Sequence, residues 1–284
     1  MGGHKRSVAV AIRTARQYPS LVLGAAVVLA IVAVAVLAPL IAPRDPLFMD
    51  ASARLQLPSA DHVLGTDNFG RDLLSRLMHG ARVSLIVGLS AVGLAIAGGT
   101  ALGLASGYLE GWGDLILMRI VDVLLAFPPL LLALSLVSVL GTGVSSVIVA
   151  VAVVQSTTYA RVVRATVLAL NREDFILAAR AQGVPGLRIA LRHLLPNSLA
   201  PVLVLATVGI GTAITTEAAL SFLGLGVPPP TPSWGATLAF GLAYLRDSPH
   251  LAIFPGIAII ITVLGFNLLG DGLRDITDPR LRRG

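Results

Sequence analysis

The residues best suited to chemistry are polar side chains that interrupt long apolar segments. Glu217 follows Thr212 and Thr215 inside the apolar segment 197–225. If that segment is a helix, a rise of about 1.5 Å per residue from Pro196 places Glu217 roughly 30 Å along it, toward its far end. If the segment crosses a membrane, a carboxylate at this position either meets a cationic group of a transported substrate or is a capped residue at a kink. The sequence leaves both interpretations open.

Other polar residues in apolar segments are weaker candidates for a transport pathway. Ser156, Thr157 and Asn267 fall in this class, because Ser, Thr and Asn also form hydrogen bonds between helices. Arg119 and Asp122 are three residues apart, close to one helical turn. We expect these two residues to form a structural ion pair within one apolar segment.

The chain lacks the motifs of common catalytic and metal sites. It has no cysteine, and its five histidines are scattered without an H-E-x-x-H motif or a G-x-S-x-G turn. Its only lysine is Lys5, so no G-x-x-x-x-G-K-[ST] loop can hold the phosphates of a nucleotide. We therefore expect no catalytic residue, no metal site and no cofactor bound by this chain.

The composition is that of a protein embedded in a membrane. Of the 284 residues, 55% are hydrophobic and 13% are charged, whereas soluble domains carry about 25% charged residues. Spans of roughly 20 apolar residues cross the hydrocarbon core of a bilayer. The sequence predicts an all-α protein with six transmembrane helices, at residues 21–42, 82–107, 118–140, 144–160, 197–225 and 251–270. Only Gly141–Gly143 separates the third span from the fourth.

The distribution of basic residues predicts the orientation in the membrane. With a cytoplasmic amino terminus, the cytoplasmic segments are 1–20, 108–117, 161–196 and 271–284, and the external segments are 43–81 and 226–250. The cytoplasmic segments then contain 14 Lys and Arg residues and the external ones contain five. Positive charge accumulates on the cytoplasmic side. We therefore expect a multi-pass protein of the cell (inner or plasma) membrane with both termini in the cytoplasm.

Small residues recur at every fourth position of the second span. They are Ala91, Ala95, Gly99, Gly103 and Gly107. Such a stripe lets two helix backbones approach closely. The contact is either within this chain or with another subunit, and the first interpretation is at least as well supported.

The segment Phe175–Asn197, "FILAARAQGVPGLRIALRHLLPN", forms a bent and largely apolar unit that we call the elbow. Asn171 is a suitable N-cap for its first helix, Gly183 can end that helix, and Pro185 prevents its continuation. A second helix carries Leu187, Leu191, Leu194 and Leu195 along one face, and Pro196 then turns the chain into the next span. A cytoplasmic helix this apolar should not be exposed to water. Either it folds back on its own bundle or a partner covers it.

The elbow resembles the coupling loop of binding-protein-dependent ABC importer permeases. That pattern is E-A-A, three residues, G, nine residues and I-x-L-P. Its matching positions here are Ala178, Ala179, Gly183, Leu195 and Pro196, whereas Leu177 replaces the glutamate and His193 the isoleucine. The resemblance implies that the elbow docks in a cleft of a cytoplasmic ATPase subunit. The expected docking residues are Phe175, Leu177, Ala178, Ala179, Arg180, Gly183, Leu187, Leu191, Leu195 and Pro196.

Three further segments resemble C-type subunits of dipeptide, oligopeptide and nickel permeases. They are "LGTDNFGRDLLSRLMHGARVSL" at Leu64–Leu85, "TEAALSFLGLGVPPPTPSWG" at Thr216–Gly235 and "FNLLGDGLRDITDPR" at Phe266–Arg280. The first segment also predicts an interfacial helix on the outer membrane surface. Its apolar face is Leu73, Leu74, Leu77 and Met78, and Asp72 can pair with Arg76 on the other side.

The resemblance implies a type I ABC importer permease with its core at about residues 80–280. An external binding protein would deliver di- or oligopeptides to a pathway between this chain and a homologous second permease subunit. Two ATPase subunits would bind ATP and Mg²⁺ and drive alternating access through the elbow. Nickel, opines or another small solute remain alternative substrates. A stand-alone secondary transporter, which would be expected to hold a carboxylate near the membrane midplane, and an intramembrane enzyme are the rival classes.

Overall fold

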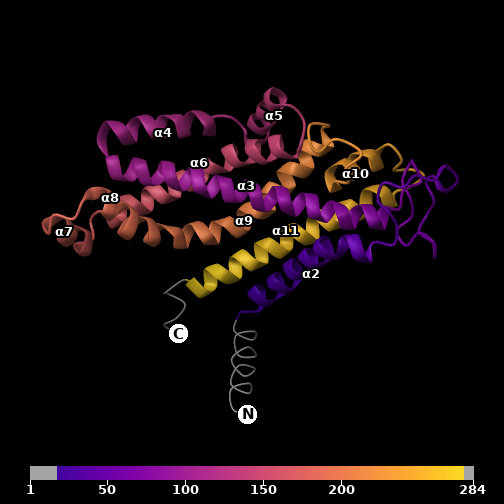
Figure 1. Cartoon of the computed structure of the whole chain (residues 1–284), viewed down its shortest axis with the longest axis horizontal. Coiled ribbons are helices and arrows are strands. Elements are labelled where there is room, and N and C mark those ends of the chain that lie inside the picture. The colour runs from indigo at the N-terminus through magenta and orange to yellow at the C-terminus, as the bar shows by residue number, and fades with distance from the viewer. Residues whose placement is uncertain (1–17, 278–284) are drawn as a thin grey trace, which may run out of the picture.

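The computed structural model describes residues 18–277 as a bundle of long helices with short connections (Figure 1). Its α-helices are α2 (Pro19–Ile41), α3 (Leu73–Leu109), α4 (Gly111–Leu125), α5 (Pro129–Leu140), α6 (Val144–Leu170), α7 (Asp174–Ala181), α8 (Gly186–Ile189), α9 (Leu195–Phe222), α10 (Trp234–Leu242) and α11 (His250–Thr277). A short 3-10 turn (Ala51–Ala53) and a π-helical turn (Ala190–Leu194) complete the elements. Residues 18–277 contain no strand, so the all-α prediction is confirmed. The outer parts of the predicted terminal segments, 1–17 and 278–284, lie outside the described residues.

Five single helices are long and apolar enough to cross a membrane, and the pair α4–α5 makes a sixth if it counts as one broken span. That pair corrects the continuous span expected at 118–140, because α4 and α5 meet at an angle of 94°. Pro128 and Pro129 cause the break, since neither has an N–H and each restricts the residue before it. The helix also begins earlier than expected, because only Glu110 separates α3 from α4.

The predicted interfacial helix is not a separate element. It forms the first two turns of α3, which continues without a break through the expected span 82–107. Trp234 of α10 covers this end of α3 and donates a hydrogen bond from its indole nitrogen to the Leu77 carbonyl at 2.9 Å. A Cβ at Gly80 would lie 2.8 Å from the Trp234 ring, so glycine makes room for the indole. Protein, and not the membrane surface, therefore buries Leu73 and Leu77.

The expected pair of Asp72 and Arg76 is also absent. Asp72 is the N-cap of α3, where one carboxylate oxygen accepts from the Ser75 N–H at 2.9 Å and the other lies 3.0 Å from His62 Nδ1. Arg76 instead donates to the Pro46 carbonyl and lies 3.6 Å from Asp67. The N-cap position commits the Asp72 carboxylate to backbone N–H groups, which a simple i,i+4 spacing argument overlooks.

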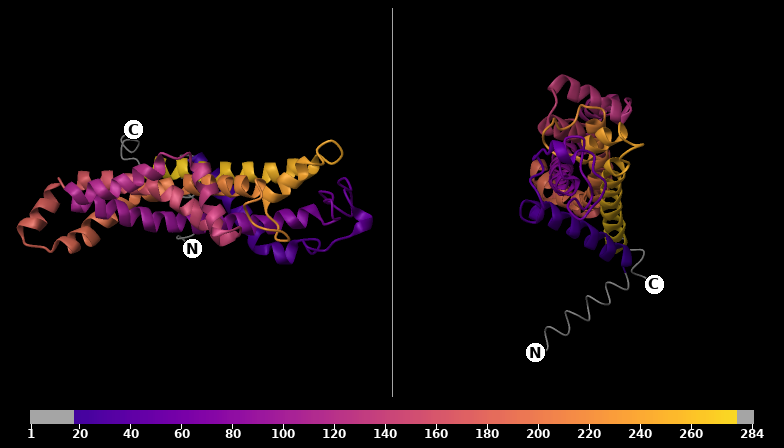
Figure 2. Two further views of the ribbon diagram at one scale, coloured as in Figure 1. Left: turned by 90° about the horizontal axis from the view of Figure 1, so that it is seen from above. Right: turned by 90° about the vertical axis from the view of Figure 1, so that its right-hand side faces the viewer.

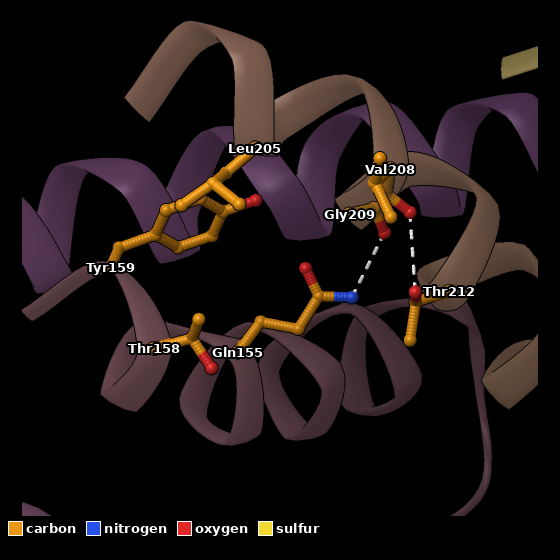
Figure 3. Close-up of a pocket in the computed structure, with 7 residues that line it drawn as sticks. All are labelled: Gln155, Thr158, Tyr159, Leu205, Val208, Gly209 and Thr212. Carbon is orange, nitrogen blue, oxygen red and sulfur yellow. Dashed lines mark hydrogen bonds between the residues drawn. The ribbon is translucent and has the colours of Figure 1, made fainter. Parts of the chain in front are cut away.

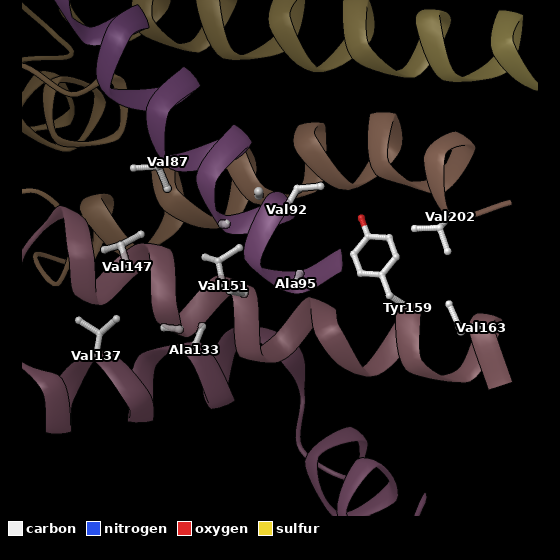
Figure 4. Packing of buried hydrophobic residues seen from close by; sticks show 14 of the residues in the cluster. Val87, Val92, Ala95, Ala133, Val137, Val147, Val151, Tyr159, Val163 and Val202 are labelled. Carbon is white, nitrogen blue, oxygen red and sulfur yellow. The ribbon is translucent and has the colours of Figure 1, made fainter. Parts of the chain in front are cut away.

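The small-residue stripe of α3 packs against α6 within this chain. A Cβ at Gly99 would lie 2.5 Å from the Ser156 carbonyl oxygen, and one at Gly103 would lie 2.4 Å from that of Ala160. Around this contact α3, α5, α6 and α9 bury a cluster of Val, Ala and Leu side chains together with Tyr159 (Figure 4). The intramolecular interpretation of the stripe is therefore correct.

The helices α2 and α11 run side by side along the other flank of the bundle (Figures 1 and 2). Glycines again set their distance, since a Cβ at Gly24 would lie 2.3 Å from the Leu269 nitrogen. A second cluster of buried side chains, which includes Ala35, Leu77, Trp234 and Phe266, joins this pair to α3 and α10. The described part of α6 is longer than the expected span 144–160 and reaches Leu170.

We predict that two adjacent glycines of α3 respond oppositely to alanine. Gly99→Ala should destabilise the protein by about 1–3 kcal/mol, because the new methyl group forces α3 away from the α6 backbone. Gly98→Ala meets nothing within 4 Å and should be neutral or gain up to about 1 kcal/mol from helix propensity. Thermal unfolding of both variants in detergent measures the difference. Equal melting temperatures would contradict the close α3–α6 contact.

Candidate functional site

The elbow projects at one end of the long bundle, and α10 with the loop before α3 lies at the opposite end (Figures 1 and 2). Its first helix is α7, whose N-cap is Glu173. The N-cap prediction for Asn171 is wrong, because Asn171 is the C-cap of α6. Arg161 and Arg164, which the sequence placed in the loop, belong to α6. Acidic residues of α4 pair with both arginines, so these charges do not end the helix.

The bend of the elbow has the hydrogen bonds of a Schellman motif. Gly183 has a φ of +74°, and its N–H donates to the Arg180 carbonyl at 2.9 Å. The Val184 N–H donates to the Ala179 carbonyl at 3.1 Å, and Pro185 is the N-cap of α8. Both expected roles, the helix end at Gly183 and the break at Pro185, are observed.

The second helix of the elbow is continuous with the next span. From Gly186 to Phe222 the chain passes through α8, the π-helical turn and α9 without interruption. The prediction that Pro196 turns the chain is therefore wrong. A proline in a regular α-helix clashes with the carbonyl four residues before it. The π-helical turn at Ala190–Leu194 widens the helix directly before Pro196, which accommodates its ring.

The elbow presents a row of uncovered apolar side chains, which we call the apolar row. Phe175, Leu177, Leu187 and Leu191 are 47%, 49%, 70% and 53% exposed. Three other side chains of the same segments, Ile176, Ile189 and Leu194, are buried in the cluster that joins α3, α5, α6 and α9. The elbow is thus anchored on one face and bare on the other, so residues 18–277 do not cover the apolar row.

The remaining predicted docking residues lie around the apolar row. Ala178, Arg180, Gly183 and Pro196 are exposed, whereas Ala179 and Leu195 are half-buried. Ala179 packs against the core beside Val184. The predicted set therefore combines surface residues with two that help to anchor the elbow.

Asn171 fixes the elbow to the end of α3, a role that its sequence position did not reveal. Its amide nitrogen donates to the Gly107 carbonyl at 3.1 Å and to the Glu110 carboxylate at 3.3 Å. Its amide oxygen accepts from the Arg180 guanidinium at 3.1 Å. These partners are up to 64 residues away in the sequence, so only the fold brings them together.

The expected ion pair of Arg119 and Asp122 does not form. Asp122 pairs with Arg161 of α6 at 2.7 Å, and the side chain of Arg119 is exposed. One turn further on, Arg164 donates two hydrogen bonds to Asp114, at 2.6 and 2.5 Å. The two parallel N–H donors of Arg164 bind the Asp114 carboxylate in the bidentate geometry of strong charge-assisted pairs. The two pairs hold α4 against α6.

Glu217 is fully buried, and its carboxylate faces three hydroxyl groups. Ser221 and Ser233 donate to one oxygen at 2.8 and 2.9 Å, and Ser84 of α3 donates to the other at 3.2 Å. The side chain thus joins α9 to α3 and to the start of α10. Of the two interpretations that the sequence left open, the structure favours a hydrogen-bonded structural residue over one that meets the substrate.

The other pathway candidates differ in their exposure. Thr212 lines a cavity of about 160 Å³ between α6 and α9 (Figure 3), and Thr215 is exposed one turn further along α9. Thr157 is buried, donates to the Val154 carbonyl and does not line this cavity. Ser156 is half-buried with a similar bond to Val153, and Asn267 is half-buried and faces Gly211 of α9.

The family whose description is "Binding-protein-dependent transport system inner membrane component" matches residues 99–283, which include the elbow and all helices from α4 onward. The chain belongs to this family. It is 45% identical to the dipeptide transport system permease protein DppC of Alkalihalophilus pseudofirmus, over 92% of this chain and 86% of that protein. It is 47% identical to the glutathione transport system permease protein GsiD of Escherichia coli, over 95% of this chain and 89% of that protein.

Membership confirms the resemblance seen in the sequence. The chain is a permease component of an ABC importer and belongs with the peptide and nickel permeases. It is a multi-pass protein of the inner membrane, in agreement with its apolar helices. Such a component works with an ATPase and a substrate-binding protein.

The structural role of Glu217 predicts the effect of removing its carboxylate. Glu217→Leu should lower stability by roughly 1–3 kcal/mol, because three buried hydroxyls lose their acceptor. Thr215→Val is the matched control, since Thr215 is exposed on the same helix and bonds only to the Gly211 carbonyl of its own helix. It should change stability by less than about 0.5 kcal/mol. Unchanged thermal unfolding of Glu217→Leu, together with lost transport, would restore the pathway role.

Proposed function

We propose that the chain is a transmembrane subunit of a peptide importer, which translocates di- or oligopeptides delivered by an extracytoplasmic binding protein. ATP hydrolysis by separate ATPase subunits drives the transport, and these subunits hold the ATP and Mg²⁺. The observation that carries the proposal is the apolar row, bare on a rigid elbow that continues into a membrane span. The dipeptide and glutathione permeases among its relatives support a peptide substrate.

In this proposal the ATPases bind the apolar row and move the elbow when they close on ATP. Because α8 continues into α9, a displacement of α8 tilts α9 directly. The first helix of the elbow, α7, would act on α6, because only three residues connect the two helices. The two helices that leave the elbow also form the two walls of the cavity beside Thr212. Motion of the elbow would therefore change the shape of that cavity.

We infer the orientation in the membrane from charge. The elbow carries Arg180, Arg188 and Arg192, all exposed at the end of the bundle where an ATPase would bind. The excess of basic residues supports a cytoplasmic location for this end and for both termini. The opposite end, with α10 and residues 42–72, then faces the binding protein. A homologous second permease subunit would complete the pathway.

A secondary transporter that works alone has less support. It would be expected to hold an ionisable residue on the pathway near the membrane midplane, and Glu217 is occupied by three serine hydroxyls. The apolar row would also remain exposed to water. Nickel, opines and other small solutes fit the same architecture, because the binding protein selects the substrate.

Leu187 offers the sharpest test of docking, since it is the most exposed member of the apolar row. Leu187→Asp should reduce co-purification of the ATPases by at least about tenfold, because a charge would be buried at the contact. Leu187→Met keeps the apolar surface and should retain the ATPases. Pull-down from membranes that contain all subunits measures both variants.

A stability measurement separates lost docking from misfolding. Leu187→Asp should leave the melting temperature of the isolated chain unchanged, because its side chain contacts solvent. Ile176→Ala, which removes a buried anchor of the elbow, should cost about 2–5 kcal/mol. Normal ATPase binding and normal ATP-dependent uptake by Leu187→Asp would refute the docking assignment.

A further inference from the structure

The cavity between α6 and α9 combines apolar walls with four polar side chains (Figure 3). Leu205, Val208 and Gly209 of α9 form one wall, and the polar lining residues are Gln155, Thr158, Tyr159 and Thr212. None of the seven lining residues is charged. The volume of about 160 Å³ is below the range of roughly 300–1,000 Å³ of pockets that hold whole drug-sized ligands. The cavity suits one small neutral group of a larger molecule.

Gln155 leaves a hydrogen-bond acceptor unused in this cavity. Its amide nitrogen donates to the Gly209 carbonyl at 3.0 Å, which fixes the orientation of the side chain. Its amide oxygen is buried and has no hydrogen-bond partner among residues 18–277. A buried acceptor without a partner costs about 1–3 kcal/mol. The arrangement is therefore explained best by a donor that is present only when something occupies the cavity.

The hydroxyl group of Tyr159 lies beside this acceptor and also has no partner in the described part of the chain. A Cβ at Gly209 would lie 2.3 Å from the Tyr159 hydroxyl oxygen and 3.2 Å from the Gln155 amide oxygen. The absence of a side chain at Gly209 thus lets both groups reach the same point of α9. One can only accept a hydrogen bond, and the other can donate one.

An acceptor next to a donor, without any charge, matches the N–H and the carbonyl of one residue in an extended peptide, which point to the same side of the backbone. The N–H would donate to the Gln155 amide oxygen, and the carbonyl would accept from the Tyr159 hydroxyl. We propose that this cavity binds the backbone N–H and carbonyl of one substrate residue as it passes, independently of the substrate's side chains and charged termini. This proposal rests on the proposed function, because it names how a peptide is held between α6 and α9.

The absence of cysteine from the chain makes the cavity accessible to a labelling test. Thr158→Cys and Thr212→Cys are placed one at a time in the reconstituted importer with cysteine-free partner subunits. A charged, membrane-impermeant methanethiosulfonate reports which cysteines meet water. Ile260→Cys is the matched control, because Ile260 is exposed on an apolar face of α11 that suits contact with lipid. Trialanine, delivered by the binding protein, is the substrate probe.

We expect both cavity cysteines to react at least about tenfold faster than Ile260→Cys and to be slowed by trialanine during turnover. Reaction as slow as that of Ile260→Cys would show that the cavity is sealed from water and would overturn the site. Fast reaction that trialanine does not change would also overturn it, since the cavity would then hold only water. If the wild-type importer takes up no peptide, the proposed function itself fails.

A second measurement tests the hydrogen bond directly. Gln155→Leu keeps the size of the side chain and should lower trialanine uptake per ATP hydrolysed by about fivefold to tenfold. Thr166→Val is the control, because Thr166 bonds to the Val162 carbonyl on the same helix and does not line the cavity. It should match the wild type. Unchanged coupling in Gln155→Leu, with wild-type peptide uptake intact, would overturn the site and leave the proposed function standing.

Discussion

The close approach of α3 and α6 is the constraint on which the other parts of the molecule depend. In lipid, apolar surface alone does not drive helices together, and small residues that allow backbone contact take over that role. Gly99, Gly103 and Gly107 provide this contact along one side of α3. The ion pairs of α6 then hold α4, and the end of α3 holds the elbow through Asn171. A shift between α3 and α6 would therefore move every one of these attachments.

Many buried polar groups among residues 18–277 have hydrogen-bond partners within the chain, which makes the exceptions informative. The carboxylate of Glu217 has three hydroxyl donors, and Asp114 has both Arg164 and Ser106. An unpaired polar group in a membrane protein costs free energy unless it faces protein or water. Among residues 18–277, buried side-chain atoms of Arg76, Thr100, Gln155 and His250 have no hydrogen-bond partner. Gln155 differs from the others because it lines the cavity between α6 and α9 and its own donor is already fixed to α9.

The sequence predicted several features that depend on neighbouring residues and missed most of those that depend on distant ones. Gly183 and Pro185 end and break the elbow helix by local rules, and both were placed correctly. The break at Pro128–Pro129 follows an equally local rule, yet hydropathy alone suggested a continuous span. The sequence placed Glu217 toward the far end of its helix but did not show which side chains it contacts, because its partner Ser84 lies 133 residues away from it. Asn171 and Asp122 likewise have partners on other helices, which no spacing within one segment can reveal.

The geometry of the elbow gives the proposed ATPase coupling a route to a cavity that has no charged lining residue. From Leu195 to Thr212 the helix α9 extends about 25 Å at 1.5 Å per residue, so a tilt of roughly 10° at the elbow moves the cavity wall by about 4 Å. A movement of that size is comparable with the width of a cavity of about 160 Å³. The wall that moves carries Gly209, whose carbonyl orients Gln155. A tilt of α9 would thus break the hydrogen bond that orients the Gln155 amide, so that its acceptor turns away from the substrate backbone without any change in charge.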